Sequence, residues 1–337
     1  MATIDDVAKL AGVSKGTVSN VFSKKRPISR EVTERVLAAA RQLNYEPNHV
    51  ARSLATRKTM IVGLKMPLSR NSTLSGFETQ MIDSVTQECA RHGYRVLLDT
   101  LPEQDDVTTF SSDPVDGVIL LNPREKDPRI ERYMRIGIPL VVIGRPQPFA
   151  DDICFVDNNN EEMAAQVGEY LIENGHRRVL FLNAFGDMTV AADRLRGLRK
   201  AFERHGIAFA EELVLYNSRK EYPNAADYGF RSVLDTYRPG NYTAVIADTD
   251  QVALGVLRAA RELGIDIPGE LSLIALSNDA TVALETTPKL TTVELNVRRL
   301  GTEAAKILIE KMNGSSEVCQ RIIDATLILR ESCRKRP

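Results

Sequence analysis

A short polar segment near the N-terminus, SKGTVSN, has residue types and spacing that suggest chemistry. Ser14 can cap a helix that begins one residue later. On that helix, Lys15 and Asn20 can reach base edges, because Lys bonds the acceptors of guanine and Asn can bond adenine at two points. Thr17, Ser19 and the backbone N–H groups of the helix start suit phosphate oxygens. The segment therefore predicts contact with a nucleic acid.

Two short helices joined by a tight turn are predicted to carry this segment. Thr3 can cap a first helix over residues 4–10, and Gly12 suits a turn with positive φ. This is the helix-turn-helix pattern, in which the second helix lies in the DNA major groove. The alternative is a helix hairpin inside an unrelated domain, which would not need small polar residues on its outer face. Four valines fall where the two crossing helices would share a core: Val7, Val13, Val18 and Val21.

A third helix and a short fourth one should follow. Ser29 can cap the third, and Asn48 can cap the fourth, over residues 49–55. So short a helix is marginal alone, so we expect it to form against a symmetry mate, against DNA, or against both. Between the second and third helices, Lys24 and Arg26 are candidate phosphate contacts, or simply solvated side chains. The third helix has an apolar stripe formed by Val32, Val36, Leu37, Ala40 and Leu43.

Charge is distributed unevenly along the chain, although the formal net charge is only −1. Residues 1–60 contain 11 Lys and Arg against 5 Asp and Glu, a balance of +6. The remaining residues contain 33 basic and 40 acidic side chains, a balance of −7. A basic head on an acidic body favours a polyanionic partner, with chance clustering as the alternative.

The composition excludes several classes of protein. The chain has no apolar run of about 18 residues, so we expect no membrane span, and it has no secretory signal, so we expect a cytoplasmic protein. Its four cysteines are scattered without CxxC spacing, which favours free thiols over a metal site or a disulfide framework.

From residue 60 onward, short apolar runs alternate with helical segments. The runs include MIVGLKM, GVILL, PLVVIG and RVLFLNA, and the alternation predicts parallel sheets covered by helices. Ligands of such folds bind beyond the carboxyl ends of the strands, often between two units. No GxGxxG and no GxSxG elbow follows a strand, and the sequence has no HExxH or Walker motif. The body is therefore predicted to bind a ligand without catalysis and without a cofactor.

The head run TIDDVAKLAGVSKGTVSNVF resembles the lactose/galactose repressor (LacI/GalR) family of bacterial transcription factors. Further ordered motifs extend the resemblance over nearly the whole chain, among them VDGVILLN, GIPLVVIGR and ADRLRGLRKAF. The resemblance implies a ligand-responsive repressor, not an enzyme, that binds a palindromic double-stranded DNA operator as a homodimer. A two-fold dimer matches such an operator because each head reads one half-site. The competing classes are a transporter's solute-binding protein and a sugar-metabolising enzyme with a fused head.

The resemblance also assigns roles in the head. It implies that Lys15, Gly16 and Asn20 read bases, and Asn20 replaces the Arg that is usual in the family. Residues 48–56 become a hinge helix that pairs with its mate in the minor groove, where Leu54 wedges into a base step. The full set of DNA-binding candidates is Thr3, Ser14, Lys15, Gly16, Thr17, Ser19, Asn20, Lys24, Arg26, Asn48, His49, Ala51, Arg52 and Leu54.

For the body, the resemblance implies a periplasmic-binding-protein-like fold. Two α/β subdomains with parallel sheets would be joined by three crossing strands, near residues 157–160, 288–292 and 317–323. We expect an all-α helix-turn-helix domain at 1–47, a hinge helix and linker at 48–59, and an effector-binding and dimerisation domain at 60–337. Within that domain, the expected N-subdomain covers about 60–157 and 292–318, and the C-subdomain about 158–290 and 319–337.

The resemblance places an effector, a sugar, sugar acid or sugar phosphate, in the cleft between the subdomains. Arg194, in the motif DRLRG, matches the family arginine that holds the effector, although a surface salt bridge is the competing explanation. Asp250 could touch the ligand or cap the next helix, and the register among Ser277, Asn278 and Asp279 stays open. The effector candidates are Asn71, Ser72, Thr73, Arg145, Asp157, Arg194, Arg219, Thr249, Asp250, Asn278 and Asp279.

Two segments depart from the family pattern. The loop after the first body strand, MPLSRNSTLSGF, lacks the aromatic pair that often stacks on a ligand. Together with Arg219, this loop predicts a pocket rich in Arg and poor in aromatic residues, which would suit a carboxylate or phosphate ligand. The link EQDDVTTFSSDP is short and polar, which predicts a truncated or irregular second helix in the N-subdomain and puts the dimer contact of that helix in doubt.

Overall fold

The computed structural model describes residues 2–23, 26–46, 58–66, 74–100, 114–218 and 221–336. The chain divides into two compact units, residues 1–60 and residues 61–337, here called the head and the body. Among the described residues, no helix is long and apolar enough to cross a membrane. The four cysteines are free thiols, and two of them, Cys89 and Cys154, are buried.

The head contains three described helices around one small core. Thr3 caps α1 (Ile4–Ala11) in a reciprocal capping box with Asp6, and Gly12 ends it with φ of 62°. Helix α2 spans Lys15–Ser23, and α3 (Arg30–Gln42) is capped by Ser29. These starts and caps match the predicted helices because side-chain capping is a local property of the chain.

The core of the head is formed mainly by the predicted apolar positions. Val7 and Val18 are fully buried, Val21 is nearly so, and Val13 packs against them. One predicted position of α3 is wrong: Leu37 is 39% exposed, and Ala39 is buried instead. Where α3 crosses α1 and α2, the close approach leaves room for a methyl group rather than for a leucine.

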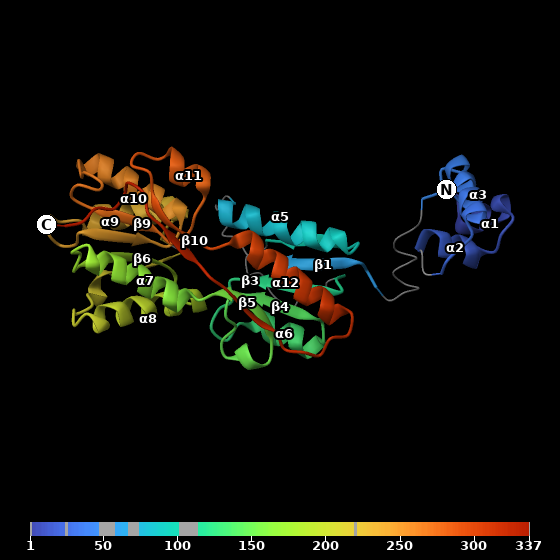
Figure 1. The fold of residues 1–337 in the computed structure, drawn as a ribbon, viewed down its shortest axis with the longest axis horizontal. Coiled ribbons are helices and arrows are strands. Elements are labelled where there is room, and N and C mark those ends of the chain that lie inside the picture. The colour runs from blue at the N-terminus through green and yellow to red at the C-terminus, as the bar shows by residue number, and fades with distance from the viewer. Residues whose placement is uncertain are drawn as a thin grey trace. The chain divides into compact units, whose positions relative to one another are not determined.

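The body contains two six-stranded sheets, one in each half (Figure 1). The N-subdomain sheet has the order β11-β5-β4-β3-β1-β2, and all its pairings are parallel. Fully buried strands such as GVILL and LVVI form its centre, as expected for a sheet covered by helices on both faces. Its elements are β1 (Ile61–Lys65), α5 (Gly76–Arg91), β2 (Arg95–Asp99), β3 (Gly117–Leu121), α6 (Pro128–Ile136), β4 (Leu140–Ile143), η1 (Phe149–Asp151), β5 (Cys154–Asn158), α12 (Val297–Met312) and β11 (Gln320–Ile323).

The C-subdomain sheet has the order β12-β10-β9-β8-β6-β7, with β12 antiparallel to β10. Helices α9 and α10 pack closely because Gly255 has no side chain: a Cβ there would lie 2.0 Å from the Ala226 carbonyl oxygen. The elements are α7 (Asn160–Glu173), β6 (Val179–Phe185), α8 (Thr189–Arg204), η2 (Glu211–Leu213), β7 (Val214–Asn217), α9 (Ala225–Thr236), β8 (Ala244–Ala247), α10 (Asp250–Leu263), β9 (Ser272–Ala275), α11 (Ala280–Glu285), β10 (Thr291–Glu294) and β12 (Thr326–Ile328).

The chain crosses between the subdomains three times, and two crossings differ from the predicted positions. The first follows β5, as expected. The second lies at residues 295–296 rather than 288–292, because β10 pairs with β9 and so belongs to the C-subdomain. The third lies at residues 324–325 rather than 317–323, because β11 pairs with β5 in the N-subdomain. The expected subdomain limits at 292–318 and 319–337 are corrected accordingly, since a strand belongs to the sheet that pairs with it.

Candidate functional site

The exposed face of α2 is the first candidate site. Lys15, Gly16 and Ser19 are exposed, and Thr17 and Asn20 are partly exposed. Residues three and four positions apart share one side of a helix, so Lys15 lies beside Ser19 and Gly16 beside Asn20. Together these residues form a polar strip opposite the buried Val18. The strip has no large side chain other than Lys15, so a groove can approach the backbone of the helix closely.

Hydrogen bonds hold the start of α2 in place. Ser14 Oγ accepts from Thr17 N at 3.1 Å and lies 2.9 Å from Thr17 Oγ1, as predicted for the helix cap. Lys15 Nζ lies 2.9 Å from Asp5 Oδ2 on α1, and both side chains are more than 60% exposed. An ion pair this exposed contributes only about 0–1 kcal/mol, so Lys15 can exchange it for a phosphate or a base at little cost.

The other DNA-binding candidates are distributed as follows. Thr3 is committed to the cap of α1, where its Oγ1 donates to Asp6 Oδ2 at 2.7 Å. Arg26 is exposed in the connection before α3. The remaining candidates lie outside the described residues: Lys24, Asn48, His49, Ala51, Arg52 and Leu54.

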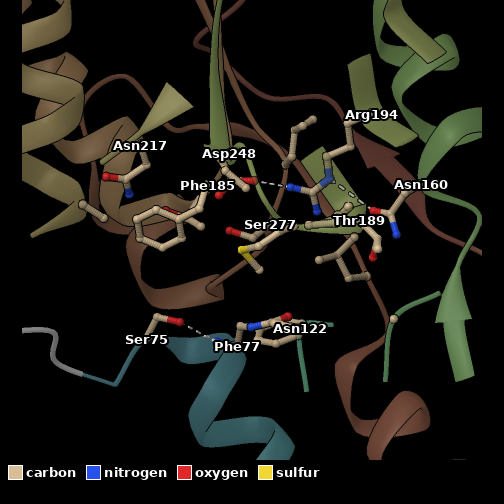
Figure 2. Close-up of a pocket in the computed structure, with 18 of the residues that line it drawn as sticks. Ser75, Phe77, Asn122, Asn160, Phe185, Thr189, Arg194, Asn217, Asp248 and Ser277 are labelled. Atoms are coloured by element: carbon tan, nitrogen blue, oxygen red, sulfur yellow. Dashed lines mark hydrogen bonds and ion pairs between the residues drawn. The ribbon is translucent and has the colours of Figure 1, made fainter. Parts of the chain in front are cut away.

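The second candidate site is a cleft in the body, with a cavity of about 250 Å³. It lies at the carboxyl ends of strands from both sheets, where a doubly wound fold is expected to bind ligands (Figure 2). The N-subdomain contributes the strand ends of β3, β4 and β5 and the start of α5. The C-subdomain contributes the ends of β6, β8 and β9 and the first turns of α8. Predicted candidates that line it are Arg145, Asp157, Arg194 and Thr249.

A buried ion pair occupies the C-subdomain side of the cleft. Arg194 projects from α8, is 7% exposed, and donates through Nη1 to Asp248 at the end of β8. Its Nε donates to Asn160 Oδ1 at 3.1 Å (Figure 2). Burial raises the pKa of Asp248, and the Arg194 charge opposes that rise. The pair therefore orients the guanidinium toward the cavity, where hydroxyl or carbonyl oxygens could accept from it.

Asp157, at the end of β5, is a second buried carboxyl in the cleft. Burial, reinforced by the charge of Asp193, raises the pKa of Asp157 to about 7. Asn160 Nδ2 donates to Asp157 Oδ1 at 3.0 Å. Near neutral pH the carboxyl can therefore act as an acceptor or, when protonated, as a donor, which suits a ligand hydroxyl.

Three predicted effector residues do not line the cavity. Asp250 is buried, and its Oδ2 accepts from Ser277 Oγ at 2.6 Å and from Asp279 N at 3.1 Å. Asp279 caps α11 by accepting from Thr281 N at 2.9 Å. Asn278 bonds Glu294, Thr292 and Arg330 within the C-subdomain. Of the uncertain run 277–279, Ser277 is the residue that lines the cavity, whereas the two following side chains bond elsewhere within the C-subdomain.

Aromatic side chains in the cleft correct the expectation of a pocket poor in aromatic residues. Phe77, Phe185 and Tyr222 all line the cavity. Phe77 follows the capping box at the start of α5, Phe185 ends β6, and Tyr222 precedes α9. Sequence reasoning missed the polar residues Asn122, Asn160 and Asp248 as well. Two of these, Asn122 and Asp248, directly follow buried strands, which is the signal that could have identified them.

Several predicted cleft residues lie outside the described part of the chain. These are Asn71, Ser72, Thr73 and Arg219, and the polar link over 103–113 also falls outside it. Within the described residues, two of the three arginines of the cavity pair with a carboxylate: Arg194 bonds Asp248, and Arg124 Nε lies 3.2 Å from Asp187 Oδ2. The third, Arg145, is exposed; burial raises the pKa of Asp193, and the charge of Arg145 opposes that rise.

Comparison with known families agrees with this arrangement. The family described as bacterial regulatory proteins, lacI family, matches residues 3–48. The family described as periplasmic binding protein-like domain matches residues 169–333. The first match contains α1, α2 and α3, and the second contains most of the C-subdomain.

Whole-chain relatives extend the similarity to both units. The HTH-type transcriptional regulator CelR of Thermobifida fusca is 30% identical over 98% of this chain and 98% of its own. The ribose operon repressor of Escherichia coli (strain K12) is 31% identical over 96% of each chain. The HTH-type transcriptional repressor PurR of Escherichia coli O139:H28 is 33% identical over 100% of this chain and 98% of its own.

Solved structures show the same fold. A CelR–cellobiose complex has a TM-score of 0.73 and 29% identity, and covers 98% of this chain and 100% of that one. The lac repressor dimer bound to operator and an anti-inducer has a TM-score of 0.82 at 23% identity, with 98% of both chains covered, and supports the fold alone. The chain therefore belongs to the lacI family of bacterial regulatory proteins, whose members are ligand-responsive transcription regulators and not enzymes.

Proposed function

We propose that this protein is a cytoplasmic, homodimeric repressor of carbohydrate-utilisation genes. Each head presents α2 to the major groove of one operator half-site, with Lys15, Gly16 and Asn20 at the bases. Residues 48–56 form the hinge helix, and Leu54 enters the minor groove. The observation that carries the DNA part of the proposal is the exposed polar strip of α2 beside a preformed helix cap.

The effector that we propose is a neutral sugar in the body cleft. Two of the three described arginines of the cleft already pair with carboxylates, so the cleft offers little excess positive charge to an anionic ligand. Phe77, Phe185 and Tyr222 offer apolar ring faces, while Arg194, Asp248 and Asn160 offer donors and acceptors for hydroxyl groups. A polyhydroxylated ring has these two kinds of surface. This choice replaces the sugar acid or sugar phosphate favoured by the Arg-rich loops.

Sugar binding is proposed to act on DNA binding by changing the order of the hinge helices. Closure of the cleft moves the N-subdomains of the two protomers, and these lead directly into residues 48–59. Such coupling is reciprocal: a sugar that weakens operator binding is itself bound more weakly in the presence of the operator.

The test is a fluorescence anisotropy titration of the full-length protein on DNA from upstream of its own gene. The titration is repeated over a salt series and with neutral sugars, sugar acids and sugar phosphates. We expect tight, salt-sensitive binding that one neutral sugar changes by at least about tenfold. Weak and equal binding to all DNA sequences would contradict the proposed operator reading. A response confined to the acidic sugars would contradict the proposed ligand class.

A further inference from the structure

One buried amide links all three segments that cross between the subdomains. Asn158 ends β5 at the first crossing and is 5% exposed. Its Nδ2 donates to Leu295 O in the second crossing at 3.0 Å and to Ile323 O at the start of the third at 2.8 Å. An amide nitrogen has two hydrogens, so both are used and neither is left for a ligand.

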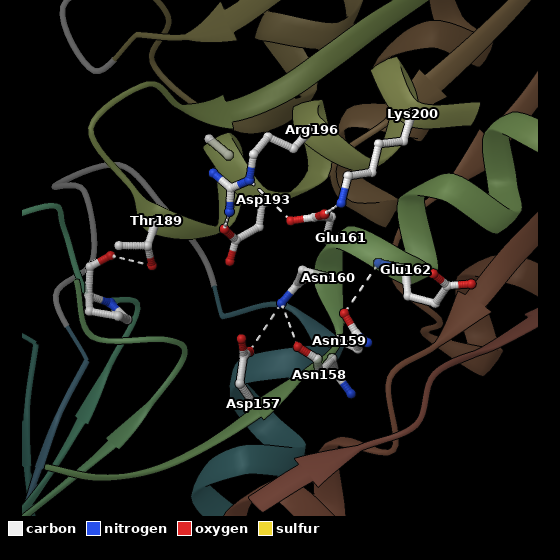
Figure 3. Close-up of polar contacts among 12 residues, drawn as sticks. Asp157, Asn158, Asn159, Asn160, Glu161, Glu162, Thr189, Asp193, Arg196 and Lys200 are labelled. Atoms are coloured by element: carbon white, nitrogen blue, oxygen red, sulfur yellow. Dashed lines mark hydrogen bonds and ion pairs between the residues drawn. The ribbon is translucent and has the colours of Figure 1, made fainter. Parts of the chain in front are cut away.

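The same crossing is connected to the ligand pocket through Asn160, the first residue of α7. Its Oδ1 accepts from Arg194 Nε at 3.1 Å (Figure 2). Its Nδ2 donates to Asp157 Oδ1 at 3.0 Å and to Asn158 O at 3.3 Å (Figure 3). Through Asn160, the pocket arginine is therefore joined by hydrogen bonds to the backbone carbonyl of Asn158, the residue whose side-chain amide links the crossings. A change at Arg194 on sugar binding can shift this series because every member is buried and bonded.

A second group of contacts joins the subdomains directly. The β3–α6 loop of the N-subdomain meets the β6–α8 loop of the C-subdomain. Thr189 N donates to Pro123 O at 3.2 Å, and Glu125 N donates to Asp187 O at 3.1 Å. These bonds, here called the cleft contacts, join backbone groups of different subdomains, so they exist only while the two halves are close. Their amide protons therefore report closure of the cleft.

We propose that Asn158 is a positioning residue: by linking the three crossings, its amide sets the angle between the subdomains and stabilises the closed cleft. The proposal deepens the proposed function, because it identifies the group through which pocket and hinge are coupled. It predicts that loss of the two Asn158 hydrogen bonds opens the cleft contacts without unfolding either sheet.

Amide hydrogen exchange of the full-length protein, without DNA or sugar, tests this. In Asn158→Asp, a carboxylate would face two carbonyl oxygens, so both hydrogen bonds are lost. We expect the amides of Thr189 and Glu125 to exchange at least about tenfold faster than in the wild type. The amides of Leu182 and Val245, within β6 and β8, should keep their wild-type rates.

Asn159→Asp is the matched control, with the same change of charge one residue away. Asn159 is exposed and caps α7 by accepting from Glu162 N at 3.3 Å, a role that Asp fills equally well. It should leave the exchange of Thr189 and Glu125 unchanged. Asn158→Ser retains one donor and is expected to fall between the wild type and Asn158→Asp.

Three results would overturn the proposal. The first is that the amides of Thr189 and Glu125 exchange in Asn158→Asp at the same rate as in the wild type. The same conclusion follows if these amides are not protected from exchange in the wild type. The second is equal acceleration of Leu182 and Val245, which would mean that Asn158 only stabilises the fold. The third applies if Asn158→Asp does not fold: Thr189 in Asn158→Ser would then exchange at the wild-type rate. The experiment contains neither operator nor sugar, so its result does not depend on the titration that tests the proposed function.

Discussion

At the scale of single residues, the cleft shows how hydrogen-bonding partners stabilise buried charged groups. Arg194 and Asp248 are largely shielded from solvent and bond each other, and Asn160 accepts a second hydrogen bond from the guanidinium. Asp157, by contrast, has an amide partner and no cation bonded to it, which leaves its protonation sensitive to burial. Two carboxyls in the same cleft thus have different chemistry because their partners differ.

The Arg194–Asp248 pair should be strongly asymmetric in its effect on stability. Arg194→Met leaves Asp248 buried without its counter-ion, so we expect a loss of about 3–5 kcal/mol in the free energy of unfolding. Arg199→Met is the control on the same helix, because Arg199 pairs with Glu211 in an ion pair that is about half exposed. That variant should lose no more than about 1 kcal/mol. Urea unfolding measures both, and equal losses would contradict the importance of burial.

The raised pKa of Asp157 gives stability a definite dependence on pH. A carboxyl with a folded pKa of about 7 binds a proton in the native state between pH 4 and 7 that the unfolded chain has released. Its contribution to stability is therefore largest at acidic pH and declines as pH rises toward 7. Asp157→Asn imitates the protonated form at every pH. We expect the variant to exceed the wild type in urea-unfolding stability, and by more at pH 8 than at pH 5. A variant that is less stable than the wild type at pH 8 would contradict the shift.

At the scale of elements, two glycines of the helix-turn-helix have different roles. Gly12 has φ of 62° and ends α1, so it is needed for backbone conformation. Gly16 has no positive φ and lies exposed within α2, where an added Cβ would have only an ordinary contact, 3.7 Å from Ser14 Oγ. Gly16 is therefore not needed for the fold, which supports a role in close approach to DNA.

Alanine at these two positions should have opposite effects on the head. Gly16→Ala should stabilise α2 by about 0.5–1 kcal/mol while weakening operator binding at least tenfold, because the methyl group enters the groove. Gly12→Ala should destabilise the turn by about 1–2 kcal/mol. Amide hydrogen exchange at Val7 and Val18 in the full chain measures the stability of the head, and fluorescence anisotropy measures its affinity for the operator. If Gly16→Ala binds the operator as well as the wild type, α2 does not approach the bases at this point.

At the scale of the whole molecule, the two compact units carry net charges of opposite sign. The head carries a balance of +6 and the body −7, and the chain divides between them at residue 60. Because the body has its own core and both of its sheets are complete without the head, it does not need the head in order to fold.

Removal of residues 1–60 should therefore separate the two binding activities. The remaining body should keep the thermal stabilisation produced by the sugar found in the anisotropy screen, and should lose all operator binding. In the full chain, the logarithm of operator affinity should fall linearly with the logarithm of salt concentration, because the basic head releases counter-ions from the phosphates. Operator binding by the isolated body, or an affinity independent of salt, would contradict this division.

The sequence by itself determined the features that depend on near neighbours in the chain. The caps at Thr3, Ser14 and Ser29, the turn at Gly12 and the buried strands were predictable because capping, φ preference and hydrophobic periodicity act over a few residues. Arg194, singled out by the family motif, lines the cleft, and its contact with an effector stays a prediction.

Only the tertiary structure decided which distant segments meet. The two later crossings were displaced because strand pairing, as between β11 and β5, joins residues more than 160 positions apart. Asp250 and Asn278 look like ligand residues in the sequence, yet they bond residues of other elements, and Asp279 instead caps α11. Phe185 and Tyr222 reach the cavity, and Asn158 links the three crossings, for the same physical reason: pairing and packing across the fold assign the partner of each side chain, and local sequence rules carry no information about that partner.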